Sequence, residues 1–232
     1  MTQHYQVTIT MQPATVTDLI NSGNVLYVFR AVQASDPAGR PLVWMSAPYS
    51  VMTQINCSDR YDAYTSPTPF KAGEQVTAGF SDAIEVGQQL QVQAGGFGEV
   101  EAGHVGAVSV LNTTGTYFTC GIGGGGGSGA APFCAFPLYG NSLQVVVPLG
   151  KILLMFSSQP VAPGTVIDDF YAPAVRSFSS GVLIDLAIEN QPSLGYDINA
   201  GWSWGGFNWG QQVPAGTGLV PLLIEPPQPD ST

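Results

Sequence analysis

The residues best suited to recognise a ligand lie in one short segment near the end of the chain, Gly201-Trp-Ser-Trp-Gly-Gly-Phe-Asn-Trp-Gly-Gln-Gln212. Three of the four tryptophans fall within it, separated by Gly, Ser and Asn. An aromatic ring can stack on the C–H face of a sugar, while a neighbouring amide bonds the sugar hydroxyls without any net charge. We therefore predict a ligand-binding site formed by these side chains: Trp202, Trp204, Phe207, Asn208, Trp209 and Gln211.

The same rings are compatible with other roles. In an extended strand Trp202 and Trp204 project from one face, and the Gly205-Gly206 pair permits a bend before the next ring. Exposed indoles also suit a membrane interface or a protein partner. The ordinary alternative is that most of the rings belong to the core, with each indole N–H bonded internally.

Residues for catalysis are scarce. A glycosidase needs two carboxylates facing each other about 5–10 Å apart, whereas Asp168 and Asp169 are adjacent and would point to opposite faces of a strand. The chain has two histidines, His4 and His104, and lacks the GxSxG and HExxH motifs. We predict that the protein is not an enzyme. A hydrolase is the least favoured alternative, since carboxylates such as Asp185 would have to converge in space.

No cofactor and no metal are predicted. Glu99, Glu101 and His104 lie in a glycine-flanked stretch and could offer surface ligands, but a lone loop histidine is usually solvated. The glycine run 123–127 is followed by neither Lys-Ser/Thr nor a helix pattern, so it does not match a phosphate-binding loop.

The three cysteines, Cys57, Cys120 and Cys134, show no CxxC spacing, which makes a zinc site improbable. Cys120 and Cys134 flank the glycine run. A disulfide between them would contribute roughly 3 kcal/mol in the chain-entropy model. The favoured alternative is two buried free thiols on neighbouring strands.

Charged residues make up 9% of the chain, against about 25% in an ordinary soluble protein. Lys and Arg number 6 and Asp and Glu 16, so the net charge of −10 reflects a shortage of cations. So few cations argue against nucleic acid and against an anionic membrane as partners. The scarcity of lysine also leaves few charges to keep subunits apart, and we expect a homo-oligomer.

Together these features predict a non-enzymatic, lectin-like binding protein whose partner is a glycan or a small neutral ligand. A self-assembling structural protein and a β-rich, membrane-active, toxin-like protein are the alternatives. The first residues form no signal peptide, and no apolar run approaches the ~20 residues of a membrane span. We expect a soluble protein, either cytoplasmic or secreted without a leader.

The elements that must position these residues are mostly short strands. His4–Met11 alternates polar and apolar side chains, the period of a half-buried strand. One helix is predicted over Ala14–Ser22, capped by Thr15 or Thr17, with Asp18 in its first turn and Gly23 at its end. The glycine run cannot be a strand interior and is predicted to be a flexible loop, with close approach of another backbone as an alternative.

Further strands are predicted at Asn24–Ala34, Leu42–Ser46, Tyr49–Cys57, Arg60–Thr65, Gln75–Phe80, Ala83–Val86, Gln89–Ala94, Gly106–Asn112, Thr116–Cys120, Phe133–Phe136, Leu143–Val147, Lys151–Ser157, Thr165–Tyr171, Gly181–Ile188, Leu194–Ile198, Trp202–Gln212 and Leu219–Ile224. This pattern predicts an all-β fold, an antiparallel β-sandwich of jelly-roll or Greek-key type with one short N-terminal helix.

Residues 1–224 are predicted to form one domain, and 225–232 an extended, proline-rich tail. Val25–Phe29 and Ile152–Phe156 are similar apolar runs, a weak indication of two equivalent halves. Arg60 and Asp62 share a face of their strand and are expected to pair on its surface.

Overall fold

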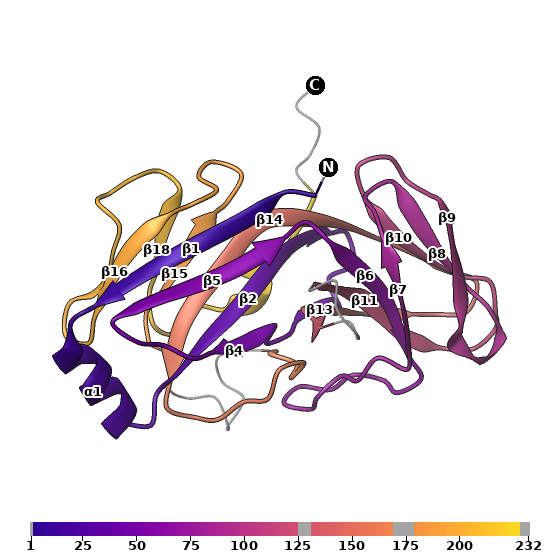
Figure 1. The fold of residues 1–232 in the computed structure, drawn as a ribbon. Helices are drawn as coiled ribbons and strands as arrows, with labels where there is room; N and C mark the ends of the chain where they lie inside the picture. The colour runs from indigo at the N-terminus through magenta and orange to yellow at the C-terminus, as the bar shows by residue number, and fades with distance from the viewer. Residues whose placement is uncertain (1, 125–130, 169–178, 228–232) are drawn as a thin grey trace.

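The computed structural model describes residues 2–124, 131–168 and 179–227 (Figure 1). Within these ranges most of the regular structure is β-strand, arranged in three sheets, together with short helices. The prediction of an all-β protein is confirmed. None of the helices in the same ranges is long and apolar enough to cross a membrane.

The first sheet contains the N-terminal strand. Its order is β17 (Gly201–Ser203), β16 (Ser193–Asp197), β1 (His4–Met11) and β5 (Met52–Ser58). Strand β1 has the bounds that its alternating pattern predicts. Its residues Val7 and Ile9 are fully buried, because every second side chain of a strand points to the same face.

The second sheet forms the middle of the molecule around one long strand, β14. Its main path is β18 (Gly210–Val213), β15 (Gly181–Asp185), β14 (Leu143–Ser157), β10 (Val108–Asn112), β8 (Gln88–Val92) and β9 (Gly98–Ala102). Strand β2 (Val25–Ala34) pairs with β14, and β4 (Met45–Ala47) and β19 (Ile224–Glu225) pair with β2. The similar runs Val25–Phe29 and Ile152–Phe156 are thus direct antiparallel partners.

The third sheet has the order β3 (Arg40–Pro41), β13 (Cys134–Leu138), β11 (Phe118–Gly124), β6 (Tyr61–Ser66) and β7 (Phe80–Ile84), with β12 (Ala131–Pro132) paired to β11. Outside the sheets lie α1 (Pro13–Asn21), α2 (Leu219–Leu223) and the 3₁₀ turn η1 (Ala94–Gly96). Strands β6, β7 and β11 lie at the same end of the molecule as β8 and β9 (Figure 1).

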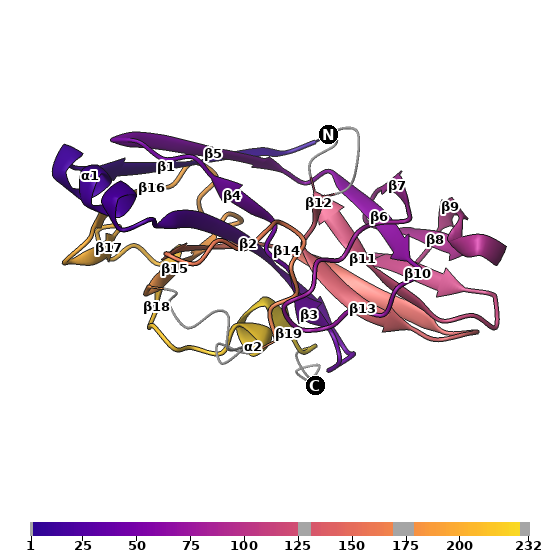
Figure 2. The same cartoon turned by 90° about the horizontal axis from the view of Figure 1, so that it is seen from below.

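The main core is shared by all three sheets: it joins side chains of the first and second sheets (Figure 2) and extends to β6, β11 and β13 of the third. Strand β2 shows the arrangement: Leu26 and Val28 face this core, while Tyr27 and Phe29 face a second cluster that includes Leu223 of α2. Both faces of β2 are therefore buried, which explains its nearly continuous apolar sequence.

The expectation of purely antiparallel pairing is wrong at three places. Strand β1 runs parallel to β16, β10 parallel to β8, and β19 parallel to β2. Parallel strands cannot be joined directly by a hairpin turn, so no turn signal in the sequence indicates these pairings. The expectation of a single helix is also wrong, because part of Leu219–Ile224 forms α2.

The caps predicted for α1 are wrong, although the helix itself is present. No side chain caps its first turn; the Thr17 hydroxyl donates to the Pro13 carbonyl, and the Thr15 hydroxyl to Asp197. Asp18 lies beyond the first turn. Gly23 does follow the helix in the left-handed conformation, with φ of 65°.

Three other local predictions need correction. Arg60 does not pair with Asp62: it precedes β6, and its Nε donates to Thr2. Thr165 forms an isolated bridge, and 169–171 lie outside the described residues. The predicted tail begins inside β19, where Glu225 accepts a 2.7 Å hydrogen bond from Lys151, and 228–232 lie outside the described residues.

The glycine run begins as strand interior, contrary to prediction. Gly123 and Gly124 complete β11 and pair with β6 and β12. Close approach of a neighbouring side chain explains the glycine at 124, because a Cβ there would lie 2.6 Å from Nη1 of Arg30. Residues 125–127 of the run lie outside the described residues.

Cys57, Cys120 and Cys134 are free and buried. Burial raises the pKa of the Cys134 thiol to about 12, partly offset by its contact with the Ile122 carbonyl and the nearby Arg30 charge. Burial also raises the pKa values of the other two thiols. Because the thiolate is the reactive form, these cysteines are protected twice, by burial and by protonation.

We therefore expect almost no reaction of the native protein with an aromatic disulfide reagent at mildly alkaline pH. Unfolding in guanidinium chloride should release three reactive thiols per chain. The absorbance of the aromatic thiolate released from the reagent measures the rate of reaction of the native protein and of the unfolded protein. A single reactive thiol after unfolding without reductant would instead show a Cys–Cys disulfide and contradict this arrangement.

Candidate functional site

The tryptophan-rich segment folds as two short strands joined by a tight turn. Strand β17 ends at Ser203, and β18 begins at Gly210. Gly205 and Gly206 have φ of 72° and 73°, a left-handed conformation that glycine adopts without steric cost. The predicted bend at this pair is present. Since β17 and β18 belong to different sheets, the turn connects the first sheet to the second at one end of the molecule (Figure 2).

The structure places Trp202 in the core, with only 5% of the residue exposed. Its ring stacks on Phe156 with centroids 5.7 Å apart and also contacts Tyr196 at 4.7 Å. Its indole N–H donates to the Ser180 carbonyl at 3.0 Å. All of its bonding capacity is therefore used inside the protein.

Trp204 fixes the turn from within. Its Nε1 donates to the Phe207 carbonyl at 3.0 Å, and the Gly210 amide donates to the same oxygen at 3.2 Å. The Trp204 ring also lies against Gly210, where a Cβ would come within 2.6 Å of Nε1. Two hydrogen bonds on one carbonyl and a ring packed on the backbone hold the turn in one shape.

Phe207 projects from this turn with 62% of the residue exposed. Its ring is nearly parallel to that of Trp209, at 14° and with centroids 6.3 Å apart. Trp209 itself is only 7% exposed and belongs to the main core. The exposed ring is thus supported from below by a buried one.

The polar residues of the predicted site are on the surface. Asn208 and Gln211 are both exposed, and Gln211 lies on β18 opposite Leu183 of β15. The turn and the start of β18 contain no charged side chain. Of the predicted residues, the structure exposes Phe207, Asn208 and Gln211, partly exposes Trp204, and buries Trp202 and Trp209. The exposed part of the segment therefore combines one apolar ring with neutral amide side chains.

A structured loop leads into β17. The Asp197 carboxylate accepts hydrogen bonds from the amides of Asn199 at 2.8 Å and Ala200 at 3.0 Å, and from the Thr15 hydroxyl at 3.1 Å. These bonds lower the pKa of Asp197. Its bonding role ties α1 to the base of the Trp-rich segment.

Other carboxylates considered for catalysis also have structural partners. Asp185 accepts a hydrogen bond from the Ala187 amide, and Asp168 forms an ion pair with Arg40. Asp169 lies outside the described residues. Among residues 2–124, 131–168 and 179–227, no three His, Cys, Asp or Glu side chains gather as metal ligands, those of Glu99, Glu101 and His104 included.

Comparison of the chain with protein-family models, with curated proteins and with solved structures finds no match.

Sequence reasoning missed a second arrangement, a buried arginine. Arg30 lies in β2 with 4% exposure, surrounded by aromatic rings. The available signal was a single charged residue inside the apolar run Val25-Leu-Tyr-Val-Phe-Arg-Ala-Val32. Charged residues are almost never fully buried unless they are paired.

Proposed function

We propose that the protein is a non-enzymatic binding protein whose surface at Phe207, Asn208 and Gln211 takes a neutral, hydroxyl-rich ligand such as a glycan. The observation that supports this proposal most strongly is the exposed Phe207 ring on a fixed turn. A ring that is already held in position loses little conformational freedom when a ligand stacks on it.

The chemistry of the neighbouring groups supports the same ligand class. Asn208 and Gln211 each carry an acceptor oxygen and a two-proton donor, so they can bond hydroxyls in either sense. The turn carries no charge that would favour an ionic ligand. In this proposal Trp209 supports the Phe207 ring from beneath, and neither buried tryptophan, Trp202 or Trp209, contacts the ligand.

A glycan array probed with wild-type protein, Phe207→Ala and Phe97→Ala tests the proposal. Phe97 is a matched control because it is 63% exposed and lies beside β9, at the other end of the molecule (Figure 2). We expect Phe207→Ala to weaken binding at least tenfold, about 1.4 kcal/mol, and Phe97→Ala to leave it unchanged. Binding that is equal in wild type and Phe207→Ala, or no binding by the wild type, would contradict the proposal.

We also propose that residues 1–224 form one domain, a β-sandwich of jelly-roll or Greek-key type. The continuous core that all three sheets share supports it. A single cooperative unfolding transition, coincident by near- and far-ultraviolet circular dichroism, is the expected result. Two separated transitions would contradict the single domain.

A further inference from the structure

A positive charge lies inside the protein at Arg30. Strand β2 directs this side chain to the same face as Val28 and Val32, toward the main core. The residue is 4% exposed, and the guanidinium stays charged at the pH at which proteins fold. Burying such a charge costs several kcal/mol unless other groups compensate it.

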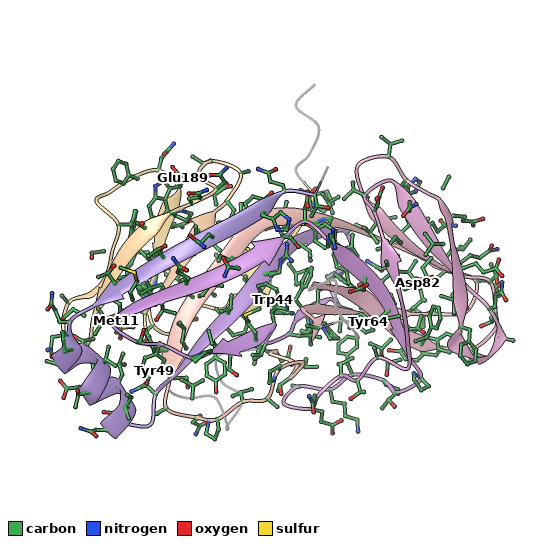
Figure 3. The ribbon with its side chains drawn as sticks, in the orientation of Figure 1. Met11, Trp44, Tyr49, Tyr64, Asp82 and Glu189 are labelled. Atoms are coloured by element: carbon green, nitrogen blue, oxygen red, sulfur yellow. The ribbon has the colours of Figure 1, made fainter. Side chains whose placement is uncertain are left out.

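Three aromatic rings provide part of that compensation. The guanidinium carbon lies 4.9 Å from the ring centre of Phe133, 5.0 Å from that of Trp44 and 5.2 Å from that of Tyr61. All three are within the ~6 Å at which a cation is attracted to a ring face. Figure 3 places Trp44 near the middle of the molecule, between the part around β2 and the part around β6 and β11.

The hydrogen bonding of this guanidinium is incomplete. Nη2 donates to the Tyr61 hydroxyl at 3.5 Å, a long contact. Nη1 is buried and has no hydrogen-bond partner, and Arg30 forms no ion pair within the described ranges. Buried polar groups are usually paired. The N–H groups of Nη1 therefore call for an acceptor, and the described residues do not supply one.

Gly124 packs closely against Nη1 of Arg30, where only a residue without a side chain fits. A Cβ there would lie 2.6 Å from Nη1 and 3.5 Å from Nε1 of Trp44. Gly124 does not have a positive φ, so its backbone conformation alone does not call for glycine. The indole N–H of Trp44 makes only a long bond, 3.4 Å, to the Gly124 carbonyl. Two N–H donors are therefore close to the side of Gly124 where a side chain would stand.

A cavity of about 240 Å³ reaches the same tryptophan. Trp44 forms one of its walls, together with Gln75, Thr77 and Pro132 among others. None of the lining residues is charged. A small anion could therefore approach Trp44 without passing a carboxylate of the lining.

We propose that Arg30 and Trp44 form a binding site for a small oxyanion, the carboxylate or phosphate group of a small molecule. An anion oxygen would accept a hydrogen bond from Nη1 of Arg30 and a second from Nε1 of Trp44. Bonds between a guanidinium and an oxyanion are about twice as strong as neutral ones, and the buried surroundings strengthen them further. This site takes an anionic ligand, whereas the surface at Phe207 takes a neutral one.

Thermal unfolding of the full chain in phosphate, in acetate and in chloride, at equal pH and ionic strength, tests the site. A ligand that binds only the folded state raises the unfolding midpoint. We expect a saturable rise in phosphate or acetate over chloride, and the more effective anion distinguishes a phosphate from a carboxylate ligand. Arg30→Met and Gly124→Ala should each weaken this anion binding at least tenfold. Arg60→Met, which removes an exposed arginine, should behave as the wild type.

Equal midpoints in the three salts for the wild type would overturn the proposal and leave Arg30 as a structural cation held by rings. An equal anion effect in wild type and Gly124→Ala would overturn it as well, since the anion would then bind elsewhere. If neither variant folds, the test uses the wild type: the nuclear magnetic resonance signals of its arginine side-chain N–H groups are followed during titration with phosphate or acetate. A buried arginine signal that moves with phosphate or acetate supports the site, and one that stays fixed overturns it.

Discussion

Replacing Phe156 by alanine is expected to lower the free energy of unfolding by about 3–5 kcal/mol, the range for removing a buried phenylalanine ring. Phe156 is completely buried in β14. Its ring meets Tyr49 edge-on at 5.4 Å, Tyr196 at 4.5 Å and Trp202 at 5.7 Å. It therefore joins the second sheet to the first, and the loss should include both buried area and ring–ring contacts.

Urea unfolding followed by circular dichroism measures this loss. Leu143→Ala is the matched control, because Leu143 lies at the other end of β14 and is 42% exposed. Surface changes of that kind usually stay within about 0.5 kcal/mol. A loss below about 1 kcal/mol for Phe156→Ala would show that the two sheets do not share this aromatic core.

Replacing Gly121 by alanine should be costly for a different reason. Gly121 lies inside β11, between β6 and β13. A Cβ there would come within 2.1 Å of the Cys134 carbonyl oxygen and 2.9 Å of the Tyr64 ring. Tyr64 is fully buried, and its hydroxyl donates to that same carbonyl at 2.8 Å. Backbone and ring would both have to move, so we expect a loss of at least 1–3 kcal/mol, the usual cost of overpacking.

The same unfolding measurement with Gly115→Ala provides the control. A Cβ on Gly115 would meet no atom within 4 Å, and its φ is not positive. This variant should match the wild type or be slightly more stable, because alanine restricts the unfolded chain. Equal stability of Gly121→Ala and Gly115→Ala would contradict the close packing of β11 against β13.

Strands with a clear alternation were predictable from the sequence. His4–Met11 was predicted with its observed bounds, because one face of β1 is buried and the other is not. The charged segment Gly98–Ala102 was missed: β9 is an edge strand, and only its pairing with β8 reveals it. The run Leu219–Ile224 has no clear period, and its packing on Tyr27 and Phe29 favours a helical turn over a strand.

The candidate site was only partly predictable, because the side chains of this segment do not keep one strand period. Composition identified the Trp-rich segment, but spacing alone cannot assign each ring to the core or the surface once a turn interrupts the strand. The structure shows that the turn at Gly205 and Gly206 separates Trp202 and Trp204 from the residues that follow. The exposed ring belongs to Phe207 and stacks on the buried Trp209, while Trp202 packs in the core against Phe156 and Tyr196.

The proposed ligand surface can be tested most directly by nuclear magnetic resonance. The ring carbons of the 11 phenylalanines would be isotope-labelled, with the Phe207 signal assigned from Phe207→Ala, during titration with the strongest neutral oligosaccharide from the array. We expect the Phe207 ring signals to shift progressively and saturably, while those of the equally exposed Phe97 stay in place. Binding of the oligosaccharide without any change at Phe207 would contradict the assignment of this surface.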